Sequence, residues 1–308
     1  MKKVIYLMLS CLYLFPLAGS GQKVGLVLSG GGAKGLAHIG VIKALEENNI
    51  PIDYITGTSM GAIIGGLYAA GYSPEDMEKL FKSEAFKNWS TGKIPPKYVY
   101  FFKQLDDNPS FIDLDFARKE DKMQLALPTN LIPSGQMDFG FMELFGPANA
   151  VAESDFNQLF VPFRCVATDI YHGEPVVFSS GDLGSSIRAS MTFPFYFKPI
   201  EIDSVLLFDG GLVNNYPCDV MYEDFQPDIM IGSAVGFKDR KPKKDDIKLQ
   251  IENMMVRKNN YYIPDSLGIT IKSPVDHISL FDFERVSEIE KAGYESTMEQ
   301  IKFIKSRI

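Results

Sequence analysis

A serine flanked by glycines is the first feature of this sequence that could do chemistry. Residues 57–61 read Gly-Thr-Ser-Met-Gly, a G-x-S-x-G pattern. A nucleophilic serine at the end of a strand needs a sharp turn to expose its oxygen, and Gly57 and Gly61 leave room for that turn around Ser59. The pattern alone is weak, because it occurs by chance in about one chain of this length in ten. Its place between a predicted strand and a predicted helix strengthens it, since the helix N-terminus brings N–H groups and partial positive charge beside the serine oxygen.

A second glycine-rich segment, residues 30–35, reads Gly-Gly-Gly-Ala-Lys-Gly and also lies between a predicted strand and a predicted helix. Consecutive residues without a Cβ let the backbone turn its N–H groups outward, which suits a developing oxyanion as well as a phosphate. Dinucleotide binding is therefore an alternative, since the spacing matches G-x-G-x-x-G and Asp53 lies about 20 residues further on. Against it, Asp53 precedes the second predicted strand, whereas the ribose-binding acid belongs after that strand. That place is taken by Ser59 and its glycines.

A serine nucleophile needs a base, and none of the three histidines is well placed to supply one. His38 lies one turn into the helix predicted after the glycine segment, His172 in a predicted turn, and His277 in a polar loop. None follows a strand end in the way that a triad histidine would, so each is interpreted as a structural or surface histidine.

Asp209 is the carboxylate best placed to act as the base. It follows the apolar predicted strand 205–208 and precedes Gly210 and Gly211, which leave room for close approach. In a parallel sheet it would share the carboxyl edge with Ser59, where the sites of such sheets gather. Without a serine in need of a partner, the same residue would be interpreted as a turn former.

The elements that must position these residues form an alternating pattern. The predicted strands are residues 24–28, 54–56, 163–168, 176–178, 205–208 and 229–231, and the predicted helices are residues 34–46, 60–70, 183–189 and 283–306. This alternation predicts an α/β fold with a mainly parallel central sheet and helices on both faces. The segment 84–135, rich in aromatic residues, has no sustained period and is expected to pack over one edge of the sheet, with a lid or an acyl-chain wall as the alternative.

The composition is that of an ordinary globular protein, since the 308 residues are 45% hydrophobic and 12% aromatic. The formal net charge of −8 disfavours sequence-independent nucleic-acid binding, which needs a basic surface to collect phosphates. Cys165 and Cys218 lie in apolar stretches and are interpreted as small buried hydrophobic residues rather than a disulfide. With only three histidines and no Cys-x-x-Cys spacing, we expect no metal site.

The N-terminal residues have the three-part layout of a secretory signal peptide. Lys2 and Lys3 precede an apolar run at residues 4–15, and small residues follow up to Ser20. The run of about 12 residues is shorter than the roughly 20 that a spanning helix needs. We predict a signal peptide at residues 1–20, one domain at residues 21–308, and a periplasmic, outer-membrane-associated or secreted protein. A retained anchoring N-terminus is the alternative.

Taken together, GGGAKG, GTSMG and DGG, in this order and with these spacings, resemble the motifs of the patatin-like phospholipases. The likeness runs from residue 23 to residue 234 and includes the stretches 35–41, 187–190 and 209–217. That family hydrolyses acyl esters with a Ser/Asp dyad, so the resemblance implies a three-layer patatin-like sandwich with Ser59 as nucleophile and Asp209 as base. It also implies an oxyanion hole at Gly30, Gly31, Gly32, Ala33 and Lys34, with Gly35, Gly57, Gly61, Gly210 and Gly211 supporting the motifs.

The resemblance further implies a lipid or acyl-ester substrate, transient contact with a membrane surface, and no cofactor, metal or nucleic acid. An apolar acyl channel is expected near the aromatic residues 193 and 195–197, whose rings core packing would explain equally well. Phospholipid, lysophospholipid, glycolipid and simple ester all remain open as substrates. A nucleotide-binding module and a lipid-binding protein with an idle dyad remain open as other functions, and the chain is expected to be either a soluble secreted form or part of a longer protein.

Overall fold

The computed structural model of the protein describes residues 21–95, 98, 115–119, 122–126, 130–235, 244–245, 250 and 261–308. The predicted signal peptide lies outside these residues, as do four of the aromatic residues in segment 84–135, namely Tyr100, Phe101, Phe102 and Phe111.

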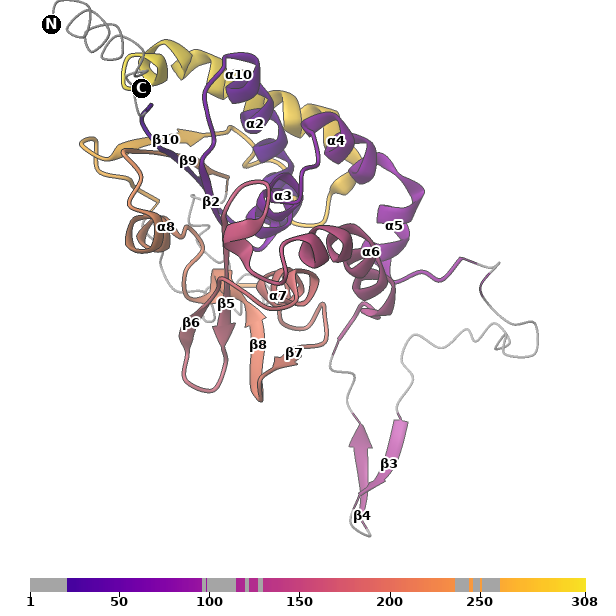
Figure 1. Ribbon diagram of the computed structural model, residues 1–308. Helices are drawn as coiled ribbons and strands as arrows, with labels where there is room; N and C mark the ends of the chain where they lie inside the picture. The colour runs from indigo at the N-terminus through magenta and orange to yellow at the C-terminus, as the bar shows by residue number, and fades with distance from the viewer. Residues whose placement is uncertain are drawn as a thin grey trace, which may run out of the picture.

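An eight-stranded sheet forms the centre of the described fold (Figure 1). Its strands are β1 (Val24–Leu28), β2 (Tyr54–Thr58), β5 (Phe163–Asp169), β6 (Glu174–Phe178), β7 (Ile200–Ile202), β8 (Val205–Asp209), β9 (Ile229–Ala234) and β10 (Gly268–Lys272). The order is β10-β9-β1-β2-β5-β8-β7, with β6 also paired to β5. Strands β10, β9, β1, β2 and β5 run parallel, whereas β6 and β8 run antiparallel to β5, and β7 runs antiparallel to β8. The predicted mainly parallel α/β sheet is confirmed, and one end of it is antiparallel.

Helices cover both faces of the sheet, because its central strands are apolar on both sides. They are α2 (Ala37–Glu47), α3 (Met60–Ala69), α4 (Pro74–Lys82), α5 (Glu84–Thr91), α6 (Gly135–Val151), α7 (Leu183–Ser190), α8 (Cys218–Phe225) and α10 (Val286–Lys305). In β1, Leu26 and Leu28 join the main core, whereas Val27 joins a smaller core with Met221 of α8. Side chains of a strand alternate in this way between the two faces of its sheet. Helices α2, α3 and α10 gather on one side of the sheet and α8 lies on the other (Figure 1).

The aromatic segment is more regular than its sequence indicates. Its described parts contain α5, the start of α6 and a two-stranded hairpin of β3 (Asp115–Lys119) and β4 (Lys122–Ala126). Phe86 of α5 packs edge-on against Phe81 of α4, with ring centroids 4.6 Å apart. The ring of Trp89 lies so close to Gly140 of α6 that a Cβ there would come within 2.6 Å of it. Helix α5 therefore packs against other helices, and the expected packing over a sheet edge is wrong for this part.

The two cysteines of the described domain form no disulfide. Cys165 is fully buried in β5, and burial raises the pKa of its thiol. Cys218 is half-buried at the start of α8. Both act as small packing side chains, in agreement with the interpretation of their apolar sequence surroundings.

Candidate active site

Two strands whose C-terminal ends meet bring Ser59 and Asp209 together. β2 pairs with residues 163–166 of β5, and β8 pairs with residues 167–169 of the same strand. Both lie along one edge of β5, because β6 pairs with residues 165–169 along the other edge. Since β2 runs parallel to β5 and β8 runs antiparallel to it, their C-terminal ends meet. The expectation that Asp209 ends a parallel strand is therefore wrong, and it is the antiparallel direction of β8 that brings Asp209 to Ser59.

Ser59 lies in a strained turn between β2 and α3. Its φ of 55° and ψ of −120° are rare for a residue with a side chain. The turn leaves no space for side chains at the flanking glycines: a Cβ at Gly57 would lie 2.4 Å from the Gly61 carbonyl oxygen, and one at Gly61 would lie 2.3 Å from that of Leu28. These neighbours are backbone atoms, which cannot move aside as a flexible side chain can. The glycines predicted to support the serine turn are therefore required by its geometry.

Asp209 is buried, with 4% of its surface exposed, and its carboxylate has two hydrogen-bond donors. The Ser59 hydroxyl donates to Oδ2 at 2.7 Å, and the Gly211 N–H donates to Oδ1 at 2.7 Å. The backbone of Asp209 is fixed as well, because its N–H donates to the Thr192 carbonyl and its carbonyl accepts from the Thr168 hydroxyl, both at 2.8 Å. Burial raises the pKa of Asp209 to about 6, although the two hydrogen bonds to the carboxylate act in the opposite direction.

The glycine segment lies directly against Ser59. A Cβ at Gly30 would come within 3.0 Å of the Ser59 Cβ. Two N–H groups of this segment are already used inside the protein: that of Gly30 donates to the Asn215 carbonyl at 3.1 Å, and that of Ala33 donates to the Leu280 carbonyl at 2.8 Å.

The N–H groups of Gly31 and Gly32 have no acceptor among the residues that the structure describes. Gly32 has a φ of 56°, in the left-handed region that favours glycine, and a Cβ there would meet the Leu280 carbonyl oxygen at 2.3 Å. The chain then enters a 3-10 turn at Gly32–Leu36, in which Lys34 is buried. Of the five residues predicted for an oxyanion hole, Gly31 and Gly32 thus have backbone N–H groups that are not used by the described residues.

The remaining glycines of the three motifs allow close packing around Ser59 and Asp209. A Cβ at Gly35 would lie 2.3 Å from the Met60 Cγ, so the glycine segment touches the first residue of α3. A Cβ at Gly210 would lie 2.1 Å from the Val166 carbonyl oxygen, and one at Gly211 would lie 2.6 Å from the Asn215 Oδ1. The 3-10 turn at Gly210–Leu212 can therefore follow Asp209 directly without pushing β8 away from β5.

All three histidines have structural or surface surroundings, as the sequence predicted. His38 is fully buried; its Nε2 donates to the Ser29 carbonyl at 2.8 Å, and its Nδ1 accepts from the Ser233 hydroxyl at 2.7 Å. The Ser29 carbonyl can only accept, which fixes this neutral tautomer, and burial lowers the pKa of His38 to about 4. His172 is exposed and contacts Asp169 at 2.5 Å, and His277 is exposed and lies 3.1 Å from a surface glutamate.

Sequence reasoning missed the residues that form hydrogen bonds to the backbones of Ser59 and Asp209. The clearest is Ser190 at the end of α7: its hydroxyl accepts from the Ser59 N–H at 3.0 Å and donates to the Val166 carbonyl at 2.6 Å. Thr192, two residues later, is the acceptor for the Asp209 N–H. Residues 187–190 resemble the family, but their types alone indicate no role, and Ser190 lies 131 positions from Ser59 in the chain.

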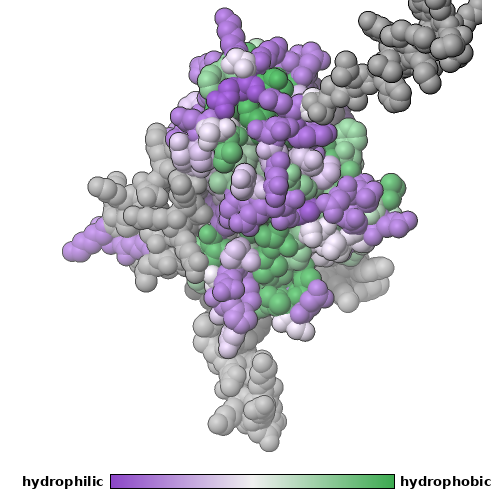
Figure 2. All heavy atoms as spheres, turned by 60° about the vertical axis from the view of Figure 1, so that its left-hand side comes forward, coloured by the Kyte–Doolittle hydropathy of each residue, from purple (hydrophilic) through white to green (hydrophobic). Residues whose placement is uncertain are grey.

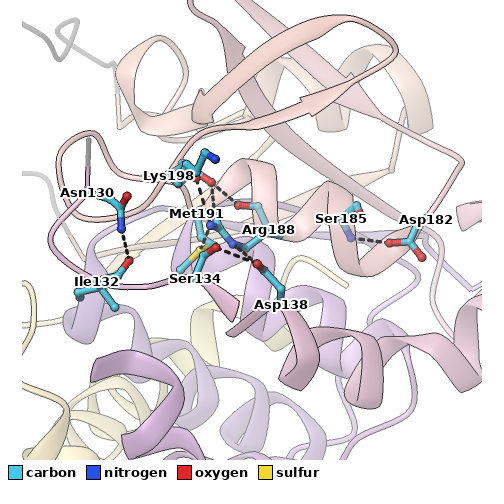
Figure 3. A network of polar contacts seen from close by, with 10 residues as sticks. Asn130, Ile132, Ser134, Asp138, Asp182, Ser185, Arg188, Met191 and Lys198 are labelled. Atoms are coloured by element: carbon cyan, nitrogen blue, oxygen red, sulfur yellow. Dashed lines mark hydrogen bonds and ion pairs between the residues drawn. The ribbon is translucent and has the colours of Figure 1, made fainter. Parts of the chain in front are cut away.

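Arg188 fixes the segment that contains these two residues. It is 3% exposed, its Nε donates to Asp138 of α6 at 2.8 Å, and its guanidinium also contacts the Lys198 carbonyl at 3.2 Å and the Thr192 hydroxyl. Figure 3 shows Arg188 at the centre of a polar network that joins α6, α7 and the loop after α7. Its guanidinium also lies 5.3 Å from the centre of the Phe197 ring, which is buried.

The rings expected near an acyl channel are divided between core and surface. Phe197 is 5% exposed, whereas Phe195 is 59% exposed and has a φ of 68°. Tyr196 stacks on Phe281 with ring centroids 4.1 Å apart. Phe281 follows Leu280, whose carbonyl accepts the Ala33 N–H, so this aromatic pair connects the loop after α7 to a segment that contacts the glycine loop.

The feature that favoured dinucleotide binding lies at the other end of the sheet. Asp53 forms an ion pair with Lys23 at 2.7 Å and accepts from the Val24 N–H at 2.9 Å, both at the amino end of β1. The glycine segment follows the carboxyl end of β1. Asp53 therefore cannot reach a nucleotide held by that segment.

Among the described residues, no group of three or more His, Cys, Asp or Glu side chains is arranged to hold a metal ion. None of the described helices combines the length and the apolar character that crossing a membrane would require.

Comparison with known proteins places residues 26–222 in a family model described as patatin-like phospholipase. A patatin-like phospholipase domain-containing protein of Caenorhabditis elegans is 36% identical over 66% of this chain, which corresponds to 13% of that protein. Lysophospholipase nte1 of Aspergillus fumigatus is 29% identical over 93% of this chain, or 18% of its own length. The chain thus spans less than a fifth of these two relatives. The crystal structure of VipD from Legionella pneumophila has the same fold, with a TM-score of 0.50 and 17% identity over 91% of this chain and 67% of that one.

Proposed function

The chain belongs to the patatin-like phospholipase family, and we propose that it is a serine hydrolase that cleaves fatty-acyl ester bonds of lipids with Ser59 and Asp209. One observation carries the proposal: the Ser59 hydroxyl donates to the buried Asp209 carboxylate at 2.7 Å, at the junction where two strands meet head to head. A nucleophile, a base within hydrogen-bonding reach and a nearby pair of backbone donors are the parts that acyl transfer requires.

In the first step, Asp209 accepts the hydroxyl proton as the Ser59 oxygen attacks the ester carbonyl carbon. The carbonyl oxygen becomes an oxyanion, and the N–H groups of Gly31 and Gly32 are the donors proposed to hold it. The intermediate then breaks its bond to the alcohol oxygen, which leaves with the proton from Asp209. The fatty-acyl group stays on Ser59 as an ester.

In the second step, water takes the place of the alcohol. Asp209 accepts a proton from the water molecule while the water oxygen attacks the acyl carbon. The same backbone donors hold the second oxyanion. The bond to the Ser59 oxygen breaks, Ser59 recovers its proton from Asp209, and the fatty acid leaves. Each proton taken by Asp209 is returned within the same step, so the site is regenerated.

Burial of Asp209 makes this carboxylate a better base than an exposed one. A pKa of about 6 leaves it mostly ionised at neutral pH, while bringing its proton affinity closer to that of the groups it serves. The raised pKa also reduces the difference from imidazole, the more common partner of a catalytic serine. The environment of Asp209 therefore supports its assignment as the base.

The substrate class is proposed from the relatives and the surface together. The relative from Aspergillus fumigatus is named a lysophospholipase, which makes phospholipids and lysophospholipids the first lipids to test. Strands β6 and β8 expose Val177 and Leu206, and the tip between β5 and β6 exposes Ile170 and Tyr171. Figure 2 shows hydrophobic residues gathered low on one face of the molecule. We expect the end of the sheet formed by β6, β8 and the tip between β5 and β6 to make the transient lipid contact. We also expect the predicted signal peptide to export the enzyme.

A serine-directed fluorophosphonate tests the proposal against its rivals. The wild-type protein should become labelled at Ser59, as located by mass spectrometry of the modified peptide, and Ser59→Ala should not. A nucleotide-binding module or an idle lipid-binding protein would remain unlabelled under the same conditions. Release of fatty acid from a mixture of phospholipids and lysophospholipids, followed by mass spectrometry, then identifies the lipid class.

A further inference from the structure

We propose that Ser190 is a positioning residue that holds Ser59 in line with Asp209. The inference rests on the proposed function, because it takes Ser59 as the nucleophile. The Ser190 hydroxyl is fully buried and has two contacts: it accepts from the Ser59 N–H at 3.0 Å and donates to the Val166 carbonyl at 2.6 Å. It therefore connects the backbone of the nucleophile to β5, the strand against which both β2 and β8 end.

The backbone of Ser59 needs such a contact because its conformation is strained. Its carbonyl accepts from the N–H groups of Ala62 and Ile63 and so begins α3, but those bonds hold only one side of the residue. The N–H points the other way, to Ser190. Without that acceptor, a partly buried N–H would lose its partner, and the turn at φ 55° could relax toward an ordinary conformation. Relaxation would rotate the Ser59 side chain away from the Asp209 carboxylate.

The same short segment also holds the base. Two residues after Ser190, the Thr192 carbonyl accepts the Asp209 N–H at 2.8 Å. Arg188, two residues before Ser190, contacts the Thr192 hydroxyl and the Lys198 carbonyl and is tied to α6 through Asp138 (Figure 3). The end of α7 is thus a single fixed support for the backbones of both members of the dyad.

This placement predicts which properties of the site a Ser190 variant should change. Ser190 contacts the nucleophile by its backbone, whereas the donors to the Asp209 carboxylate among the described residues are Ser59 and Gly211. Loss of the Ser190 hydroxyl should therefore misplace the nucleophile, so that the Asp209 carboxylate loses the hydrogen bond from the Ser59 hydroxyl. The turnover number should fall, and the midpoint of the acid limb of the pH profile should move to higher pH, because that hydrogen bond lowers the pKa of Asp209.

The experiment compares Ser190→Ala with Ser186→Ala. Ser186 is a matched control, because it lies on the same helix, is 2% exposed, and uses its hydroxyl to bond the Asp182 carbonyl at 2.9 Å, away from the dyad. We expect Ser190→Ala to lower the rate constant of fluorophosphonate labelling and kcat on a soluble ester by about 10- to 100-fold, the scale set by small displacements of a reacting group. KM should be unchanged and the midpoint of the acid limb should move to higher pH. Ser186→Ala should stay within about twofold of the wild-type rate and should keep the wild-type midpoint.

A second variant keeps the test valid if Ser190→Ala does not fold. Ser190→Cys retains nearly the same shape but offers a sulfur that is a weak acceptor, so its labelling rate should lie between those of the wild type and Ser190→Ala. Thermal melting shows whether each variant is folded at the assay temperature.

Three results would overturn the inference: wild-type labelling rates in a Ser190 variant, equal slowing in Ser186→Ala, or an acid limb in Ser190→Ala that keeps its midpoint or moves to lower pH. The last would mean that the Ser59 hydroxyl still reaches Asp209 without Ser190. A wild-type protein that reacts with no fluorophosphonate at all would contradict the proposed function itself, and is thereby distinguished from these three.

Discussion

As the proposed base, Asp209 must meet two requirements that oppose each other, since it has to be ionised to accept a proton and yet it is buried. Burial raises its pKa to about 6, and the hydrogen bonds from Ser59 and Gly211 limit that rise by stabilising the charged form. At neutral pH the carboxylate is therefore still mostly ionised. The two hydrogen bonds therefore keep the carboxylate ionised at neutral pH and also fix its position.

Removing either member of the dyad should abolish most of the activity without unfolding the protein. We expect Ser59→Ala and Asp209→Asn each to lower kcat for ester hydrolysis by at least about 100-fold. Both changes keep the volume of the site nearly constant, so circular dichroism spectra should match that of the wild type. Near-normal turnover by Asp209→Asn would exclude Asp209 as the base.

The pH dependence of the reaction should report the ionisation of Asp209. Because the ionised form is the base, kcat/KM for a neutral ester should fall tenfold per pH unit below about 6 and should be flat just above it. His38 should not contribute, since its pKa of about 4 and its two internal hydrogen bonds keep it neutral over this range. A midpoint near 4, the ordinary value for an exposed aspartate, would show that burial does not tune this carboxylate.

At the scale of elements, the contact between α2 and α10 is a very close one. It depends on two glycines: a Cβ at Gly40 would come within 1.9 Å of the Glu290 carbonyl oxygen, and one at Gly293 would come within 1.9 Å of that of Ala37. Both obstacles are helix backbone. Because α2 directly follows the glycine segment, this contact also supports the loop that faces Ser59.

Adding one methyl group at this contact should separate the two helices. We expect Gly293→Ala to lower the free energy of unfolding by about 1–3 kcal/mol through overpacking, as measured by urea denaturation. Gly135→Ala is the matched control, because Gly135 is the exposed first residue of α6 and a Cβ added there would have no described atom within 4 Å. There the smaller backbone entropy of alanine in the unfolded chain should leave the stability unchanged or raise it by up to about 1 kcal/mol. Equal effects at the two positions would contradict the close contact.

At the scale of the whole molecule, burial of the Asp209 carboxylate lowers the free energy of unfolding at neutral pH. Asp209 has an ordinary pKa of 3.8 when unfolded and one of about 6 when folded, so the unfolded state releases its proton first as the pH rises. The contribution of Asp209 to the free energy of unfolding should therefore fall by about 3 kcal/mol as the pH rises from about 4 to about 6. Below pH 4 the aspartate is protonated in both states and this contribution disappears.

Asp209→Asn should remove this cost, because the amide has no charge to bury. We expect the variant to be more stable than the wild type at pH 7.5 and the difference to shrink progressively toward pH 4.5, as measured by urea denaturation at each pH. A stability difference that does not change with pH would mean that the charge of Asp209 is not the cause. The same variant should therefore have a lower kcat and a higher free energy of unfolding at neutral pH.

The sequence by itself determined the local chemistry. Gly57 and Gly61 around Ser59 predicted a tight turn, and the structure contains it because backbone atoms fill the space that side chains would need. The alternation of apolar runs and helical patterns predicted the mainly parallel sheet. Short elements with mixed patterns, such as β7 and β10, were not predicted, since their strand character depends on the neighbours with which they pair.

Only the tertiary structure decided how the two reactive residues meet. The five residues of β8 do not predict its direction. A strand has the same pattern of apolar residues in parallel and antiparallel pairs when its side chains face the same core. Its antiparallel pairing with β5 ends β8 against β2 and places Asp209 at Ser59. The burial that raises the pKa of Asp209, and the approach of Ser190 across 131 positions, likewise arise only when distant segments pack together.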